Sequence, residues 1–223
     1  SGGFMQKKAK VVILCGGKGT RLREETEYRP KPMIEIGGKP ILWHIMKYYS
    51  SFGYNDFILC LGYKSEVIKE YFHNYHIRNS DFTIDLSCRD IKVHTACLEE
   101  NWKITLVDTG IDTLKGARIK KIEKYVDTDY LLLTYGDGVA DVSLDKLVEF
   151  HKSHGKIGTV TGVRPPSRFG EIEVSKNAVT KFTEKPQTST GLINGGFFVL
   201  NKNIMDYLTE DEDCDFERGA LEQ

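Results

Sequence analysis

Long apolar runs are absent from this sequence of 223 residues. The longest ones, such as Val11–Cys15 and Phe57–Leu61, fall well short of the ~18 residues that a membrane-spanning helix needs. The N-terminus also lacks the apolar stretch of a signal peptide. We therefore expect no membrane partner, and we interpret residues 1–4, which precede Met5, as the remnant of an expression tag.

Net charge is also nearly absent. The sequence has 31 Lys and Arg residues against 32 Asp and Glu residues, which leaves a formal charge of −1. Such a balance creates no general field that would attract nucleic acid or an anionic membrane surface. We therefore expect no nucleic-acid partner, and an anionic ligand must be held by a local site.

Paired cysteines are missing as well. The five cysteines form an odd set without a CxxC pair. Cys15 and Cys60 lie in apolar, strand-like runs, where a thiol behaves as a small hydrophobic group. The pattern predicts reduced thiols and a cytoplasmic protein.

What the sequence does contain is an alternation of strand-like and helix-like segments. Strand-like runs at Lys10–Cys15 and Asp56–Leu61 are followed by segments with apolar residues at the helical period, Pro40–Ser51 and Ser65–Asn74. This order predicts parallel strands joined by right-handed crossovers. A further strand at Tyr130–Tyr135 precedes a helix from about Ser143 to His154, with Ser143 as its N-cap and Gly155 as its stop.

Shorter segments complete the expected α/β fold. Three of them alternate apolar and polar residues and are predicted as short strands, open to antiparallel pairing: Phe82–Leu86, Ile91–Val93 and Ile104–Val107. The last third predicts strands at Ile157–Val163, Glu171–Val174, Val179–Phe182 and Gly196–Leu200. No repeat or linker divides the chain, so we predict a single domain over residues 5–223.

A glycine-rich segment directly follows the first strand: Leu14, Cys15, Gly16, Gly17, Lys18, Gly19, Thr20 and Arg21. Glycines let backbone N–H groups approach an anion, Thr20 adds a hydroxyl donor, and the guanidinium of Arg21 suits phosphate oxygens. The segment lacks the Gly-Lys-Ser/Thr of a Walker A loop, and Leu22 replaces the third glycine of a dinucleotide fingerprint. We predict a phosphate cradle; the alternative is a plain glycine-rich turn.

Two further segments offer charged groups. Pro30 and Pro32 fix the backbone on both sides of Lys31, which presents its ammonium group at a defined place, unless this is a stiff surface loop with a solvated lysine. Asp137 lies between glycines at the end of the Tyr130–Tyr135 strand, where open α/β sheets bind ligands. Mg²⁺ takes only one or two protein carboxylates beside phosphates, so Asp137 is the predicted metal ligand; the alternative is an Asp-Gly turn.

Together these segments suit the transfer of a nucleotidyl group to a phosphate monoester. Such displacements depend mainly on positioning and on charge stabilisation. The attacking phosphate, with a second pKa of about 6, is already largely dianionic at neutral pH, so no general base is needed. We predict Arg21, Lys31 and Asp137 as the catalytic residues.

With these segments assembled, the chain resembles the sugar-phosphate nucleotidyltransferases, and among them the glucose-1-phosphate cytidylyltransferases. The resemblance runs from about Lys10 to Asn201 and includes LCGGKGTRL, RPKPMIEIGGKPILWHIMKYY, TYGDGVAD, EKP and INGGFFVLN. It implies a Rossmann-like, mixed and mostly parallel sheet flanked by helices. It also implies CTP as substrate, Mg²⁺ as cofactor, and a CDP-sugar and pyrophosphate as products, with a role in polysaccharide biosynthesis.

The resemblance also implies residue roles. It assigns the nucleotide and its phosphates to Leu14, Cys15, Gly16, Gly17, Lys18, Gly19, Thr20, Arg21, Lys31, Thr113, Arg118 and Gly136. It assigns the acceptor sugar phosphate to Glu184, Lys185, Asn194 and Gly195. Without the resemblance, these last four residues would be read as a surface turn and the start of a strand.

Two departures from the family pattern bear on function. The resemblance implies a second metal-binding aspartate beyond a helix that begins near Phe216, and we expect that segment to be missing because the sequence ends at Gln223. Where glucose-specific members resemble TGGR, this chain has Lys115-Gly116-Ala117-Arg118. A methyl group and a positive charge there would alter the acceptor pocket.

Three hypotheses stay open at this stage. The first is a CTP-dependent transferase acting on glucose 1-phosphate or, as a variant, on another phosphorylated acceptor such as a phosphoglutamine-type compound in capsule modification. The second is a non-catalytic nucleotide-binding module, and the third is a dinucleotide oxidoreductase, which Leu22 disfavours. We further expect a homo-oligomer.

Overall fold

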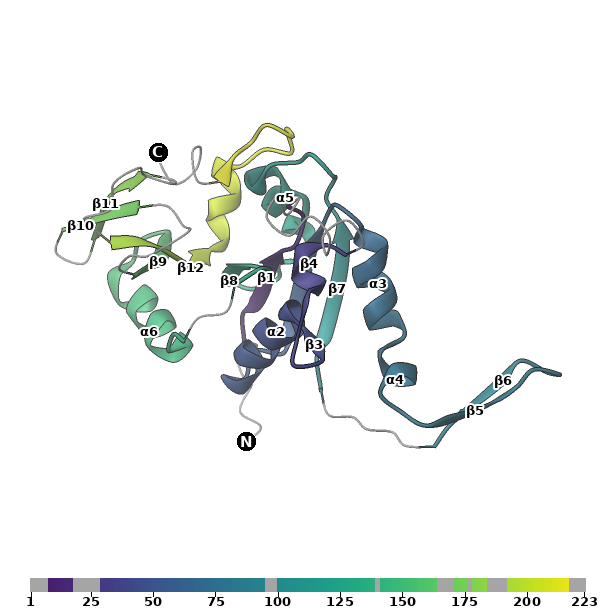
Figure 1. The fold of residues 1–223 in the computed structure, drawn as a ribbon. Helices are drawn as coiled ribbons and strands as arrows, with labels where there is room; N and C mark the ends of the chain where they lie inside the picture. Colours follow the sequence, from purple (N-terminus) through teal and green to yellow (C-terminus); the bar gives the residue numbers. More distant parts are fainter. Residues whose placement is uncertain are drawn as a thin grey trace, which may run out of the picture.

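A mixed sheet forms the centre of the protein in the computed structural model. The structure describes residues 8–17, 29–94, 100–138, 141–163, 171–175, 178–183 and 192–216. Within these ranges it describes the side chains of all residues except those between 163 and 195. Eight strands take part, and β9 (Gly158–Val163) pairs with β12 outside the main order. Along the sheet (Figure 1) the other strands are β11 (Ala178–Thr183), β10 (Glu171–Ser175), β12 (Leu192–Asn201), β8 (Tyr130–Tyr135), β1 (Lys10–Leu14), β4 (Asp56–Leu61) and β7 (Lys103–Asp108).

Four neighbouring strands are parallel: β1 pairs with β4 and β8, and β4 pairs with β7. Their carboxyl ends, at Leu14, Leu61, Asp108 and Tyr135, therefore lie along one edge of the sheet. The predicted mixed sheet flanked by helices is confirmed. The strand predicted at Ile104–Val107 is present as β7, and its pairing, which the sequence left open, is parallel because the helical crossover after β4 returns the chain in the same direction.

Strands β1, β4 and β8 are buried on both faces, which explains their nearly unbroken apolar sequences. On one face Val11, Ile13 and Phe57 pack against α2 (Ile41–Ser51), α3 (Ser65–His73) and α6 (Leu144–His154). On the other face Val12 and Ile58 pack against α5 (Lys115–Lys121) and the 3₁₀ helix Lys202–Tyr207. Each face of the sheet thus has its own apolar core.

The ends of α6 follow the sequence signals. The Ser143 side chain accepts a hydrogen bond from the Lys146 backbone N–H at 3.5 Å, and Gly155 ends the helix with φ of 69°. The predicted cap and stop are confirmed. In the described part of the chain, no helix is both long enough and apolar enough to cross a membrane.

The region beyond the parallel strands is antiparallel. Strand β12 pairs with β8, β9 and β10, and β10 pairs with β11. All four strands predicted for the last third are present, although β12 begins at Leu192, before the predicted Gly196. The extra length comes from pairing with β9 and β10, which the sequence pattern of β12 alone does not show.

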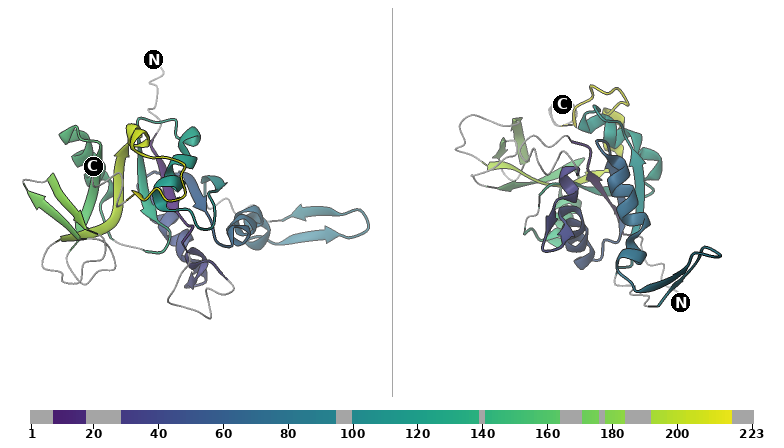
Figure 2. Two further views of the ribbon diagram at one scale, coloured as in Figure 1. Left: turned by 90° about the horizontal axis from the view of Figure 1, so that it is seen from above. Right: turned by 45° about the vertical axis from the view of Figure 1, so that its right-hand side comes forward.

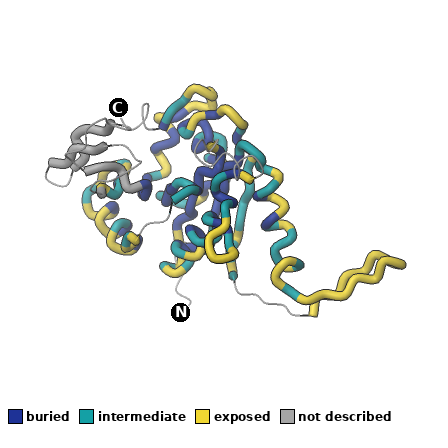
Figure 3. Tube along the Cα trace, viewed as in Figure 1, coloured by how far each residue is buried: buried dark blue, intermediate teal, exposed yellow. Residues whose placement is uncertain are grey.

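A two-stranded hairpin leaves the body of the molecule after α4 (Tyr75–Arg78). Its strands β5 (Phe82–Asp85) and β6 (Asp90–Val93) are present as predicted, and they pair antiparallel, which the sequence left open. The hairpin projects from the sheet in every view (Figures 1 and 2). All of its strand residues are exposed (Figure 3).

Candidate functional site at the carboxyl ends of the parallel strands

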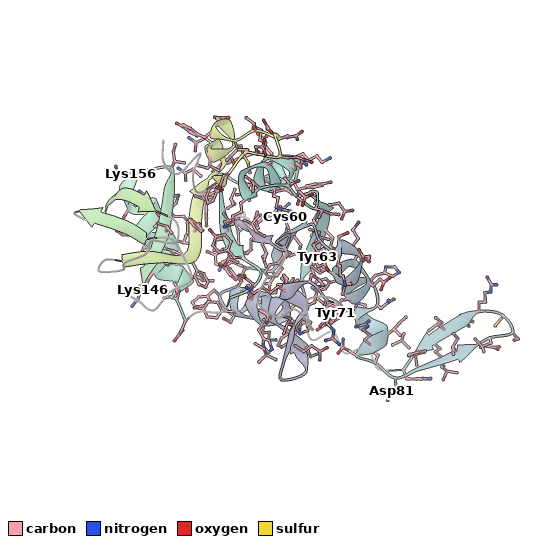
Figure 4. All side chains as sticks on the ribbon, turned by 45° about the horizontal axis from the view of Figure 1, so that its top comes forward. Cys60, Tyr63, Tyr71, Asp81, Lys146 and Lys156 are labelled. Atoms are coloured by element: carbon pink, nitrogen blue, oxygen red, sulfur yellow. The ribbon has the colours of Figure 1, made fainter. Side chains whose placement is uncertain are left out.

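The start of the glycine-rich segment forms backbone hydrogen bonds with residues of both neighbouring strands or the turns after them. The Gly136 backbone N–H donates to the Leu14 carbonyl at 2.9 Å, and the Cys15 N–H donates to the Cys60 carbonyl at 2.9 Å. Cys60 lies near the middle of the molecule in Figure 4. The backbone that carries the predicted phosphate cradle is therefore held on both sides as it leaves β1.

Lys31 and Asp137 meet across this edge. The Lys31 Nζ lies 2.8 Å from the Asp137 Oδ2, although the two residues come from the 3₁₀ helix Lys31–Met33 and the turn after β8. Their side chains are 28% and 38% exposed, so both charges are reachable from solvent. The structure thus brings together two of the three predicted catalytic residues in a place open to a ligand.

Gly136 controls how closely the Lys31 segment approaches the strands. A Cβ atom at this position would lie 3.1 Å from both the Leu14 carbonyl oxygen and the Pro32 Cγ, and 3.2 Å from the Cys15 Sγ. These contacts are tighter than ordinary van der Waals packing. The glycine therefore lets the proline beside Lys31 pack directly over the end of β1.

Arg118 lies buried beneath the same edge, with 4% of its surface exposed. The guanidinium has five N–H groups, and each donates to an acceptor within the protein at 2.7–3.3 Å: the Gly16, Leu61, Ile111 and Thr113 carbonyls and the Thr109 hydroxyl. These acceptors follow or end β1, β4 and β7. In this structure Arg118 therefore connects the ends of three strands by hydrogen bonds.

Two glycines make room for this arginine. A Cβ at Gly62 would lie 2.6 Å from the Arg118 Nη1, and one at Gly16 would overlap the guanidinium. Sequence reasoning predicted Arg118 as a nucleotide or substrate contact and missed its hydrogen bonds to the backbone. The glycines at the ends of the neighbouring strands were the one signal of a buried bulky group, and the contact with a ligand stays a prediction.

Thr113, the other predicted contact in this region, is also buried. Its carbonyl accepts from the Arg118 Nε at 2.7 Å. Its hydroxyl oxygen has no hydrogen-bond partner among the described residues, so Thr113 retains a polar group that a ligand could use. Its role in binding stays a prediction.

Cys15 offers no nucleophile. Burial raises the pKa of its thiol well above the usual value, with further contributions from Cys60 and Asp137 that outweigh the opposing effect of Arg118. The protonated thiol is the weak form of the group.

A divalent cation fits the donor set only if phosphates supply most of its ligands. Within the described ranges, no group of three or more His, Cys, Asp or Glu side chains could hold a metal ion. Asp137 provides one accessible carboxylate, and Mg²⁺ bound to phosphates needs only one or two. The residues present thus suit a cation carried in by a nucleotide.

Several predicted residues cannot be placed. Those outside the described ranges are Lys18, Gly19, Thr20, Arg21, Glu184 and Lys185. Asn194 and Gly195 lie in β12, where the Asn194 backbone pairs with Gly162 of β9, but their side chains are not described. The roles of all these residues stay predictions.

Comparison with known proteins agrees with this geometry. Residues 10–222 match the family described as Nucleotidyl transferase. The glucose-1-phosphate cytidylyltransferase of Salmonella typhi is 52% identical over 203 residues, which cover 91% of this chain and 79% of that protein. A probable glucose-1-phosphate cytidylyltransferase of Bacillus subtilis is 48% identical over 212 residues, which cover 95% of this chain and 82% of that protein.

A solved structure has a similar fold. HddC from Yersinia pseudotuberculosis, solved in complex with GMP-PN, is 28% identical and superimposes with a TM-score of 0.69, covering 94% of this chain and 84% of HddC. These matches leave no support for a dinucleotide oxidoreductase. With its Rossmann-like sheet and its match to the family over residues 10–222, this chain belongs to the nucleotidyl transferase family.

Proposed function

We propose that this chain is a cytidylyltransferase that couples CTP to glucose 1-phosphate and releases CDP-glucose and pyrophosphate. The observation that carries the proposal is the meeting of Lys31 and Asp137, 2.8 Å apart at the carboxyl edge of the parallel strands. The identity of the base and of the sugar is supported by 52% identity to the enzyme of Salmonella typhi.

The proposed reaction is a single displacement. An oxygen of the acceptor's phosphate attacks the α-phosphorus of CTP and forms a new O–P bond. The bond from that phosphorus to the bridging oxygen breaks, and pyrophosphate leaves with the electron pair. Because the attacking phosphate is already largely dianionic, no side chain has to remove a proton.

The chain's own contribution is positive charge held in place. When the triphosphate binds, the Lys31 ammonium group turns from the Asp137 carboxylate to the α-phosphate and stabilises the charge that develops there. The Pro30 and Pro32 rings limit the backbone freedom of this lysine. The Asp137 carboxylate would hold Mg²⁺, which would neutralise phosphate charge.

The remaining roles are part of the same proposal. Gly19, Thr20 and Arg21 would contact the triphosphate, with Lys18 and residues 14–17 along the cytidine and its phosphates. Glu184, Lys185, Asn194 and Gly195 would bind the acceptor. We also propose a single domain, a cytoplasmic location, a role in polysaccharide biosynthesis and a homo-oligomer.

The structure bears on the choice of acceptor. Ala117, which replaces a glycine of the TGGR pattern, is completely buried, and its N–H donates to the Cys214 carbonyl at 3.1 Å. Its methyl group therefore does not line an open acceptor pocket. Lys115 lies over the Tyr135 ring at 4.7 Å, so the added charge at this position already interacts within the protein. These two substitutions therefore give no structural argument against glucose 1-phosphate as the acceptor, and the preference for it is supported by the 52% identity to the enzyme of Salmonella typhi.

The test is a matrix of nucleotides and acceptors. Pyrophosphate release is measured with CTP, UTP, dTTP and GTP against glucose 1-phosphate, mannose 1-phosphate and a phosphoglutamine-type compound, with Mg²⁺, on the longest natural form of the protein. We expect the fastest release with CTP and glucose 1-phosphate. Release with another acceptor alone would contradict the proposed substrate, and CTP binding by calorimetry without any release would indicate a non-catalytic module.

A further inference from the structure

Strands β8 and β12 separate at Thr134. Their backbone pairing runs from Tyr130 opposite Asn201 to Thr134 opposite Phe197, where it ends. Past this point β8 leads to Asp137, whereas the first two residues of β12 pair with β10 (Figure 1). The place where the strands separate therefore lies between the predicted metal ligand and the part of β12 predicted to bind the acceptor.

Strand β12 carries extra residues at this place. Asn194 pairs with Gly162 of β9 and Phe198 pairs with Val160, so four residue steps along β12 match only two along β9. Gly196 lies inside this bulge with φ of 78°, a backbone conformation that favours glycine. Bulges bend a strand and redirect its residues, and they are frequent beside active sites. The bulge therefore determines where the backbone of Asn194 lies relative to β8.

Two threonine hydroxyl groups bind the backbone of the bulge. The Thr134 hydroxyl, from β8, donates to the Gly196 carbonyl at 2.9 Å. The Thr161 hydroxyl, from β9, accepts from the Phe197 N–H at 3.3 Å and donates to the Phe197 carbonyl at 3.4 Å. Only Thr134 shares a strand with Asp137, which follows it by three residues.

The surroundings of this hydrogen bond are buried and held in place. Thr134 is 2% exposed, so water does not compete for its hydroxyl. The ring of Phe197 stacks on that of Tyr49 in α2, with 6.1 Å between the ring centroids. The Gly136 N–H donates to the Leu14 carbonyl at 2.9 Å. Because both strands are fixed in this way, the bond from Thr134 to Gly196 sets the position of the bulge relative to Asp137.

We propose that Thr134 is a positioning residue for the acceptor. Its hydroxyl holds the Gly196 carbonyl and so keeps Asn194 and Gly195 in register with Asp137. An attacking oxygen must lie within about 3–3.5 Å of the phosphorus that it attacks, so a displaced bulge impairs the acceptor without disturbing CTP. The inference rests on the proposed function, which supplies the acceptor.

The first test compares two substitutions of Thr134. Thr134→Val keeps the branched shape and removes the hydroxyl, and Thr134→Ser keeps the hydroxyl. We expect Thr134→Val to raise KM for glucose 1-phosphate about fivefold, the size expected for one lost hydrogen bond, and KM for CTP less than about twofold. Thr134→Ser should restore the first value. An equal rise in both KM values, no rise, or no recovery with serine would overturn the proposal.

Tyr49→Phe is the matched control. The Tyr49 hydroxyl is also hydrogen-bonded to the Thr134 side chain, so this variant removes a buried hydroxyl at the same place and leaves the bond from Thr134 to Gly196 intact. KM for glucose 1-phosphate should not change. A rise as large as that in Thr134→Val would show that general loosening of the core is responsible, and would overturn the proposal.

Hydrogen exchange gives a measurement that does not depend on turnover. In Thr134→Val, amides in peptides that cover 192–200 should exchange at least about fivefold faster, while those of β1 and β4 should not change. Unchanged exchange in 192–200 would overturn the positioning role alone. If the unmodified protein released no pyrophosphate with any acceptor, the proposed function would fail, and the inference about the acceptor would fail with it.

Discussion

The central parallel strands and the projecting hairpin are both β structure, yet the apolar side chains of the first are buried and those of the second are exposed. Strand β4 reads DFILCL and is buried on both faces. Strands β5 and β6 read FTID and DIKV and are exposed throughout. An unbroken apolar run indicates a strand that its own chain covers on both faces, whereas an alternating run indicates a strand with one apolar and one polar face.

The largest expected effect on the free energy of unfolding comes from a substitution in the buried parallel strands. Ile58 is fully buried beside Val12. Truncation of such a side chain costs about 2–5 kcal/mol because it removes buried methyl groups and leaves a cavity. We therefore expect Ile58→Ala to lower the free energy of unfolding by that amount in urea titrations. A loss below about 1 kcal/mol would show that the parallel centre is less tightly packed than described.

The second effect concerns the arginine that joins the strand ends. Arg118→Met keeps most of the side chain's length but removes all five donors, which leaves buried carbonyls without partners. We expect a loss of about 3 kcal/mol in unfolding free energy, given about 1–3 kcal/mol for an unsatisfied buried polar group.

Arg118→Lys is the matched variant. It retains the charge and three donors, so it should recover part of the loss seen with Arg118→Met. If the Met and Lys variants were both as stable as the unmodified protein, the strand ends would be held by the sheet alone.

A third effect is a pH dependence of stability. Burial lowers the pKa of His151, and the hydrogen bond to Asn201 opposes the shift only partly. The unfolded chain therefore binds a proton more readily than the folded one, with an ordinary pKa of about 6.5. Stability should fall as the pH drops below about 6.5, by up to about 1.4 kcal/mol per pH unit for this one group.

His151→Gln removes this titration. Its unfolding free energy should change less between pH 7.5 and pH 5.5 than that of the unmodified protein, measured by urea titration at each pH. The same pH dependence in both proteins would assign the acid sensitivity to other groups.

The smallest effect lies on the hairpin. Ile84 is 48% exposed, and substitutions at exposed positions usually change stability by less than about 0.5 kcal/mol. Ile84→Ala should therefore have little effect on the unfolding free energy of the dilute, dissociated chain, in contrast to Ile58→Ala. A cost as large as that in the core would mean that the hairpin face is covered within its own subunit.

The sequence predicted the fold where local signals and global packing agree. The bounds of Asp56–Leu61 and Tyr130–Tyr135 match the structure, because unbroken apolar runs ended by polar or glycine residues mark buried strands. The direction of Lys103–Asp108 was not fixed, because parallel and antiparallel pairing leave the same alternation in a short strand.

For the candidate site, the sequence predicted which charged groups to look for. Lys31 and Asp137 lie 2.8 Å apart, which follows from the rule that the carboxyl ends of parallel strands share one edge. The position of Arg118 could not be predicted in the same way. Its acceptors are backbone carbonyls, which every residue carries and which therefore leave no pattern in the sequence.

The most direct test of the central claim is the turnover of Lys31→Met with CTP and glucose 1-phosphate, measured as pyrophosphate release. Lys39→Met is the matched control, because Lys39 is half-buried like Lys31 and donates to the Asn79 side chain away from Asp137. Loss of a group that stabilises transition-state charge costs about 100- to 1,000-fold in rate, so we predict a loss of that size in kcat/KM for Lys31→Met and none for Lys39→Met. Undiminished turnover in a folded Lys31→Met protein would contradict the account.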